Sequence, residues 1–206
     1  MGLVASLARP GGNITGSQHL QDDLLGKRLQ LLRDAVPRLS RVAYLDESVT
    51  RSDAQRAHRQ ENGRASARSN GLEFHFYTAG KSTNFPDLFS EMGRNGDDGL
   101  IVESSPFIFL NRKQIIELAA RHRVPGNYNA AWYVEAGGLM SYGADRAALN
   151  LIATSFVDRI LKGAKPSELP IEQAVKNEFA VNLKTAKALG LTIPPSVLAR
   201  ADRVIE

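Results

Sequence analysis

The sequence predicts an α/β protein in which helices cover both faces of a parallel β-sheet. Short apolar or alternating runs of strand length recur at residues 41–46, 72–77 and 100–103. Between them lie longer segments whose apolar side chains repeat at helical spacing. Strands that alternate with helices favour parallel pairing, because each crossover helix packs back onto the sheet.

The amino-terminal half gives the clearest pattern of elements. Residues 24–35 predict a helix, because leucine and alanine recur at helical spacing until Pro37 ends it. Residues 41–46 predict the first strand. Residues 53–69 predict a helix with a weak apolar face, and the turn sequence Asn70-Gly71 follows it. Residues 72–77 then alternate apolar and polar side chains, which is typical of a strand.

The second half continues the alternation. We expect further strands at residues 100–103, 124–128, 139–141 and 179–183. We expect further helices at residues 86–94, 112–123, 147–162, 185–189 and 196–204. The helix at 147–162 carries an apolar stripe, and Gly163 follows it where a carboxyl-terminal cap belongs.

Composition narrows the classes of function. The chain has 206 residues, a net charge of +4 and no cysteine, which excludes disulfides, thiolate nucleophiles and cysteine-based metal sites. The moderate positive charge permits contact with nucleic acid without arguing for it. The apolar run at residues 3–8 is too short for a signal peptide, and no run is long enough to span a membrane.

Motifs for nucleotide, metal and hydrolytic chemistry are absent from the sequence. The segment Gly11–Gly16 is followed by Ser17, where a phosphate-binding loop needs lysine. The sequence contains no GxGxxG after a strand, no HExxH and no GxSxG, and its histidines occur singly. We therefore expect no cofactor and no metal. We interpret the arginine-rich stretch 51–68 as a solvated helix face, with no nucleic-acid partner.

Polar residues follow several of the predicted strands. Ligands of parallel α/β sheets bind outside the carboxyl ends of the strands, so the segments 46–48, 78–81, 103–106 and 128–130 are candidates. Ser104 and Ser105 either face a ligand or cap the following helix. Residues 127–133 combine amides with aromatic rings, which either line a pocket or pack in the core.

Six stretches of the chain resemble the substrate-binding proteins of bacterial ABC transporters, in the subfamily associated with tryptophan, tyrosine and similar ligands. The stretches are residues 3–16, 26–42, 116–123, 134–143, 160–170 and 182–206. The last of them, which contains NLKTAKALGLTIPPSVLARAD, is the longest and most specific. The resemblance covers nearly the whole chain in order.

The resemblance implies a type I periplasmic-binding-protein fold, with two lobes that close over a ligand. It implies non-catalytic binding of a small organic solute, an aromatic amino acid or a related compound, and delivery to an ABC permease. It also implies that a stretch of the family's first lobe is missing before Leu3. We expect residues 1–37 to belong to that first lobe, residues 38–143 to form the α/β ligand-binding lobe, and residues 144–206 to supply the returning helix, the final strand and the carboxyl-terminal helices.

The predicted ligand site combines strand-end loops with a hinge loop. It comprises Asn13, Thr15, Asp46, Ser48, Ser104, Ser105, Tyr128 and Asn129. We expect Asp46 to hold an amino group, the serines and Asn129 to take a carboxylate, and Tyr128 to stack on a ring. The sequence departs from the family at Asp46-Glu47-Ser48, where a Trp-Asn-Pro-like loop is usual, and at Ser104-Ser105-Pro106, where Asp-Pro is usual.

Alternatives remain open at this point. The family is periplasmic, whereas the absence of an export signal predicts a cytoplasmic location if Met1 is the native start. A cytosolic ligand-sensing or interaction module of the same fold is therefore the second candidate. A hydrolase or transferase that uses Ser104 or Ser105 is the third, although no nucleophile motif supports it. Because the helices at 24–35 and 147–162 would face the missing lobe, we also expect a homodimer or a swapped arrangement to cover their apolar stripes.

Overall fold

The computed structural model describes residues 3–18, 24–47, 52–103, 105–173 and 176–206. The chain divides into two compact units. Unit 1 comprises Met1–Gln21 and Ala144–Asn177, and unit 2 comprises Asp22–Gly143 and Glu178–Glu206.

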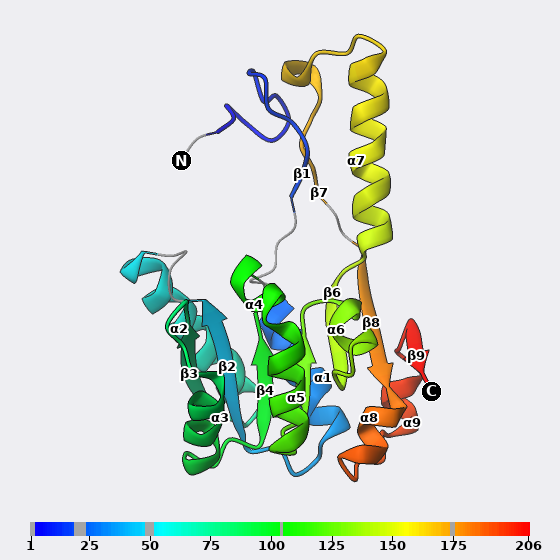
Figure 1. Cartoon of the computed structure of the whole chain (residues 1–206). Coiled ribbons are helices and arrows are strands. Elements are labelled where there is room, and N and C mark those ends of the chain that lie inside the picture. Colours follow the sequence, from blue (N-terminus) through cyan, green and yellow to red (C-terminus); the bar gives the residue numbers. More distant parts are fainter. Residues whose placement is uncertain (1–2, 19–23, 48–51, 104, 174–175) are drawn as a thin grey trace. The chain divides into compact units, whose positions relative to one another are not determined.

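A seven-stranded sheet is the framework of unit 2. Its strands are β2 (Arg41–Glu47), β3 (Glu73–Ala79), β4 (Gly99–Val102), β5 (Gly126–Tyr128), β6 (Met140–Ala144), β8 (Asn177–Asn182) and β9 (Arg203–Ile205). They lie in the order β3-β2-β4-β5-β6-β8-β9 (Figure 1). The pairs from β3 through β6 are parallel, and so is β8 with β9. The expected parallel α/β class is confirmed.

The direction of the sheet reverses between β6 and β8. The amide of Asn182, at the end of β8, donates to the carbonyl of Leu139, directly before β6 begins (2.8 Å). The amide of Asp145, just after β6, donates to the carbonyl of Lys176, just before β8 (3.0 Å). The end of each strand therefore lies beside the start of the other, and β8 runs antiparallel to β6.

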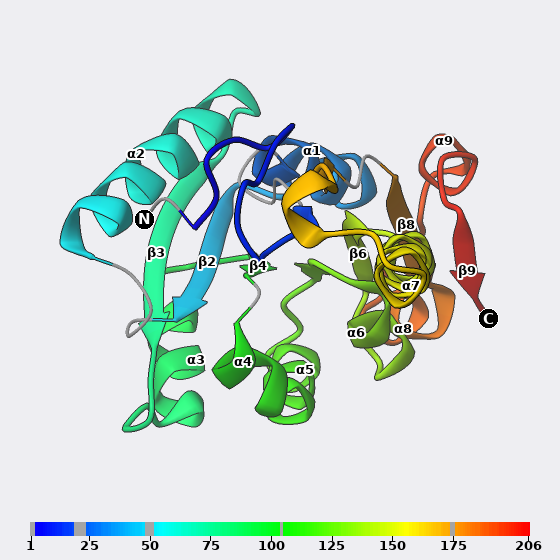
Figure 2. The ribbon, with the colours of Figure 1, turned by 90° about the horizontal axis from the view of Figure 1, so that it is seen from above.

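Helices pack on both faces of this sheet. Figure 2 shows α1 (Leu25–Ala35) and α2 (Asp53–Ser69) on one face, with α3 (Phe85–Arg94) and α5 (Arg112–Arg121) on the other. Two buried apolar clusters, one on each side, join helices to strands. The shorter helices of unit 2 are α4 (Pro106–Leu110), α6 (Ala131–Glu135), α8 (Leu183–Ala188) and α9 (Pro195–Leu198).

The position of α1 corrects one expectation. We expected the helix at 24–35 to belong to the first lobe, with its apolar stripe in need of a cover. In the structure Leu29 and Leu32 are fully buried, in a cluster that includes Val42 and Ile101 of the sheet. Helix α1 is thus part of unit 2, because its leucine stripe is the surface that covers β2 and β4.

The described part of unit 1 contains one long helix and a pair of short strands. Strand β1 (Ser17–Gln18) pairs in parallel with β7 (Glu172–Gln173), and α7 (Arg146–Leu161) precedes a single 3-10 turn, η2 (Pro166–Glu168). Asp145 caps α7 by accepting from two of its first amides. Of the expected apolar stripe only Phe156 is buried, whereas Leu161 is 82% exposed. A dimer that covers this stripe stays a prediction.

Short elements account for most differences from the predicted secondary structure. The segment 196–204 was expected to be one helix, but α9 ends at Leu198 and β9 begins at Arg203. The helices α4 and α6 and the strands β1 and β7 had no counterpart in the prediction. Each spans five residues or fewer, too few for a helical or alternating period to repeat. Among the described residues, no helix is both long and apolar enough to cross a membrane.

Candidate functional site

The topology of unit 2 marks one position on the sheet. From β2 the chain crosses to β3 on one side and then to β4 on the other, so both neighbours of β2 follow it in sequence. In doubly wound sheets this switch point opens a crevice outside the carboxyl ends of the two central strands, and ligands bind there. Here the crevice lies beyond the ends of β2 and β4, where Asp46 and Glu103 are found.

Glu103 is the centre of a buried polar cluster at this position. Its carboxylate, 1% exposed, accepts hydrogen bonds from Arg28 Nη2 (3.0 Å) and Tyr44 Oη (2.8 Å). Arg59 Nη1 lies 3.3 Å from the same carboxylate oxygen and donates to Tyr44 Oη at 2.7 Å. The amide of Glu103 donates to the carbonyl of Leu45, which fixes the end of β4 against β2.

Asp46 extends the cluster along the same face of β2, two residues beyond Tyr44. Its carboxylate is 1% exposed and lies 3.9 Å from Arg59 Nε. Two arginines and two carboxylates therefore meet here, and pairing with an opposite charge is the condition under which charged groups tolerate burial. Burial, reinforced by the Glu103 carboxylate, raises the pKa of the Tyr44 phenol well above its ordinary value.

Helix α2 brings Arg59 into this cluster through local sequence signals. Ser52 and Gln55 form a capping box that starts the helix. Arg59, Gly63 and Ala67 lie four residues apart and are the buried face of α2. A Cβ on Gly63 would overlap the ring of Phe74, so the glycine permits the close approach of α2 to β3. That approach places the Arg59 guanidinium over the end of the sheet.

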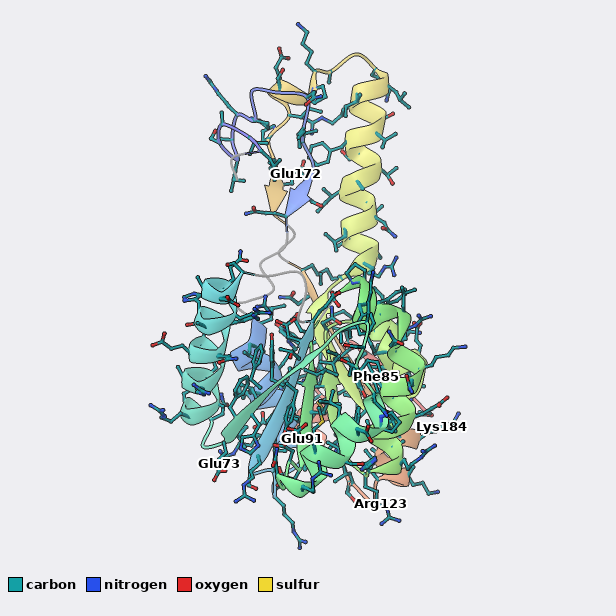
Figure 3. All side chains as sticks on the ribbon, turned by 60° about the vertical axis from the view of Figure 1, so that its left-hand side comes forward. Glu73, Phe85, Glu91, Arg123, Glu172 and Lys184 are labelled. Carbon is teal, nitrogen blue, oxygen red and sulfur yellow. The ribbon has the colours of Figure 1, made fainter. Side chains whose placement is uncertain are left out.

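A pocket opens beside the cluster, within unit 2. Its volume is about 120 Å³. Helix α1, strand β2, helix α2 and the end of β4 contribute its walls. The lining residues are Leu25, Tyr44, Gln55, His58, Arg59, Asn62 and Glu103. Glu73 begins β3 and Arg123 lies just before β5, so both lie at the end of the sheet opposite the carboxyl ends of the strands, as Figure 3 shows.

The predicted site residues lie in different surroundings, and only some of them are at the switch point. Asp46 lies at the switch point, in the charged cluster described above. Asn129 follows β5, is 8% exposed, and its Oδ1 accepts no hydrogen bond from the part of the chain that is described. Ser105 caps α4 by accepting from the amide of Ile108 (3.1 Å), so the capping alternative is confirmed for this serine. Ser48 and Ser104 lie outside the described residues.

The role expected for Tyr128 is wrong. Its ring is 1% exposed and stacks on Tyr133, with 5.0 Å between the ring centroids. Burial raises its pKa well above the usual value. The ring belongs to the apolar cluster on the α3 and α5 face and is not available to stack on a ligand. For Tyr128 and Tyr133, core packing is therefore the correct alternative.

Asn13 and Thr15 lie in unit 1. Thr15 donates its hydroxyl to the carbonyl of Leu169 (2.7 Å), which joins the amino-terminal loop to the segment after α7. Asn13 is exposed. A ligand-binding role for either residue remains a prediction.

Sequence reasoning missed two arginines of the cluster. Arg28 is 1% exposed within a helix read as an apolar stripe, and Arg59 was assigned to a solvated face although it is 9% exposed. Their spacing held a signal, because Arg28 is four residues from Leu32 and Arg59 four from Gly63, so each shares the buried face of its helix. Among the described residues, no group of acidic or histidine side chains is arranged to hold a metal ion.

Comparisons with known proteins agree with this architecture. A tyrosine-binding protein of Clostridioides difficile (strain R20291) is 24% identical over 197 residues, which is 92% of this chain and 53% of that protein. The chain thus spans about half the length of this curated relative.

Two solved structures match nearly the whole chain. The ABC domain in complex with L-Trp from Streptococcus pneumonia matches with a TM-score of 0.82 and 27% identity, covering 98% of this chain and 68% of that one. A conserved domain protein from Vibrio cholerae O1 biovar El Tor matches with a TM-score of 0.82 and 25% identity, covering 98% and 66%. The family model for ABC transporter substrate binding proteins matches residues 1–205. The chain therefore belongs to the family of ABC transporter substrate-binding proteins.

Proposed function

We propose that this chain is the solute-binding component of an ABC transporter and that its ligand binds at the switch point of the unit 2 sheet. The observation that carries the proposal is the buried cluster of Arg28, Asp46, Arg59 and Glu103 beside a pocket, at the position where sheets of this topology bind ligands. Relatives named for tyrosine and bound to L-Trp support an aromatic amino acid or a related compound as the ligand.

Two groups at the strand ends fit the polar end of such a ligand. The carboxylate of Asp46 is a partner for an ammonium group, because an ion pair inside a crevice is weakly screened. The buried Oδ1 of Asn129 is an acceptor that a ligand N–H would satisfy, which removes a desolvation cost of about 1–3 kcal/mol. The serines expected at the site are not needed for this proposal.

The family supplies the rest of the proposal. Its members bind solutes and are not enzymes, and we extend both properties to this chain. The partner would be an ABC permease, and the location periplasmic or extracellular, as is typical of the family. A cytosolic sensor of the same fold has no observation in its favour, and the capping role of Ser105 leaves the enzyme alternative without a placed nucleophile.

Isothermal titration calorimetry of the full chain against aromatic, aliphatic and charged amino acids tests the proposal. We expect heat of binding from at least one aromatic amino acid. Asp46→Asn keeps the shape of the side chain but removes its charge, and should weaken that binding at least tenfold. Asp34→Asn changes an exposed carboxylate that pairs with Arg200 and serves as the matched control. Equal affinities of the two variants would contradict the assignment, and no heat from any amino acid would contradict the function.

A further inference from the structure

Among the described strands, β3 pairs with β2 alone and so forms an outer edge of the unit 2 sheet (Figure 1). It is seven residues long, whereas β9 at the other edge has only three. Its register with β2 runs from Glu73 to Ala79 without a bulge, and its sequence EFHFYTA contains neither proline nor lysine. Proteins commonly protect a sheet edge with a short strand, a bulge, proline or lysine, and β3 has none of these.

The outward backbone groups of this edge belong to alternate residues. The amide of Glu73 donates to the carbonyl of Ser40 (2.8 Å), so the backbone of Glu73 points toward β2. Successive residues of a strand direct their amides and carbonyls to opposite sides. The amides and carbonyls of Phe74, Phe76 and Thr78 therefore point away from β2, where a further strand can pair with them.

Helix α2 presents one flank above this edge. Three residues of its other flank line the pocket beside α1, which lies on the same face of the sheet (Figure 2). The residues of the outer flank are exposed and recur every three or four positions: Asp53, Ala57, Glu61, Arg64 and Arg68. Two of them, Arg64 and Arg68, line an open groove together with residues 72–75 of the edge. The outer flank and the β3 edge are therefore one continuous surface.

The charges of the outer flank differ between its two ends. Asp53 lies in the first turn of α2, and its side chain is 93% exposed although its carboxylate contacts a neighbouring arginine. Arg68 lies in the last turn, and within the described part of the chain neither Arg64 nor Arg68 forms an ion pair. Glu73, in the same groove, is paired with Arg41 (2.9 Å). The flank thus begins with an acid and ends with two arginines, which complements a copy of itself that runs in the opposite direction.

We propose that the β3 edge and the outer flank of α2 form a twofold interface between two copies of this chain. A twofold axis perpendicular to the sheet makes β3 antiparallel to its copy. With the axis at Phe76, this residue exchanges two hydrogen bonds with its counterpart, and Phe74 pairs with the partner's Thr78. These are the residues whose backbone groups point outward. The ring of Phe76, which is only partly buried, is covered by its counterpart.

The helices above the edge follow the same symmetry. Helix α2 has 17 residues and is about 25 Å long, and β3 has seven residues and is about 23 Å long. The axis at the middle of β3 therefore passes near the middle of α2, and it brings Asp53 toward the partner's Arg68 twice in each dimer. This inference goes beyond the proposed function and does not depend on it, because it uses the edge of the sheet and not the strand ends.

Sedimentation velocity of the full chain at several concentrations tests the interface. One strand pair and one helix pair make a small contact, so we expect a reversible dimer with a dissociation constant of about 10–100 μM. Hydrogen exchange followed by NMR should show the amides of Phe74, Phe76 and Thr78 becoming protected as the concentration rises. A chain that stays monomeric at about 1 mM, or a dimer without this protection, would overturn the proposal.

Charge reversal tests the contact between the helices. Arg68→Glu places like charges opposite each other at two symmetric positions and should weaken the dimer by about tenfold or more. Asp53→Lys combined with Arg68→Glu restores opposite charges and should restore the dimer. The matched control is Arg121→Glu, which reverses an exposed arginine in the last turn of α5 and should leave the dimer unchanged. Equal dimerisation of Arg68→Glu and Arg121→Glu would contradict the inference.

Thr78→Pro tests the pairing of the strands, because it removes an outward amide that the fold of the single chain does not use. It should abolish the dimer and leave the melting temperature of the dilute chain nearly unchanged. Leu161→Ser, on the exposed stripe of α7, separates this interface from a dimer formed through unit 1. A dimer that persists in Thr78→Pro and is lost in Leu161→Ser would place the contact in unit 1 and overturn the proposal.

Discussion

Replacement of Glu103 by glutamine tests whether the charged cluster holds the site together. The change keeps the size of the side chain and removes its negative charge. In the native chain this carboxylate receives Arg28 at 3.0 Å, Tyr44 at 2.8 Å and Arg59 at 3.3 Å, all from side chains no more than 10% exposed. In Glu103→Gln the buried Arg28 loses the carboxylate with which it pairs, whereas Arg59 keeps its contact with Asp46.

The expected cost follows from the burial of the cluster. Removing one partner of a buried ion pair destabilises a protein by about 3–5 kcal/mol, because the remaining charge stays desolvated. That loss is a large part of the roughly 5–15 kcal/mol by which a typical domain is stable. With a urea m-value of about 2 kcal/mol/M, the midpoint of unfolding should fall by about 2 M.

Urea titration followed by circular dichroism measures this shift. The control is Glu73→Gln, which removes the partner of Arg41 in an ion pair of 2.9 Å whose side chains are 44% and 64% exposed. Exposed pairs contribute about 0–1 kcal/mol, so the control should barely move the midpoint. A loss below about 1 kcal/mol for Glu103→Gln would refute the reasoning, since it would mean that the cluster is effectively solvated.

Two further predictions concern packing and pH. Gly63→Ala should destabilise the chain by about 1–3 kcal/mol, because its Cβ would overlap the ring of Phe74. Gly26→Ala, where the nearest side chain is 4.0 Å away, should stabilise helix α1 by about 0.5–1 kcal/mol. Lys176 and the first amides of α7 lower the pKa of Asp145 below 3.8. The ionised Asp145 side chain therefore stabilises the folded chain at neutral pH, and this contribution is lost as the pH falls through the lowered pKa.

Thermal unfolding measures both sets of changes. Equal melting temperatures for the two glycine variants would contradict the close approach of α2 to β3. For Asp145, the comparison is Asp145→Ala against the native chain between pH 7 and pH 2. The difference in stability should shrink in the acid range, and a difference independent of pH would contradict the ion pair with Lys176.

The sequence was sufficient to predict the framework of unit 2. Its strands and long helices repeat their apolar periods often enough to be recognised, and the expected strands at 41–46, 72–77 and 100–103 correspond to β2, β3 and β4. The alternation could not reveal that α1 lies on the same sheet, because an apolar stripe indicates that a helix is covered without indicating by which surface.

The site was predicted only in part. Asp46 and the segment from Glu103 were identified because they follow strands, and that position depends on the topology alone. Arg28 and Arg59 were missed because their roles depend on which faces of α1 and α2 pack on the sheet. Tyr128 was misassigned because its position at the end of β5 does not specify whether its side chain points toward the crevice or into the apolar cluster under α3 and α5.

The most direct test of the central claim is an amide NMR titration of the full chain with the aromatic amino acid that calorimetry finds to bind best. We expect the shifts to gather at the carboxyl ends of the strands, around Asp46, Glu103 and Asn129. Residues at the opposite end of the sheet, such as Glu73 and Arg123, should not shift. Shifts that gather at Glu73 and Arg123 and spare the switch point would contradict a ligand site at the ends of β2 and β4.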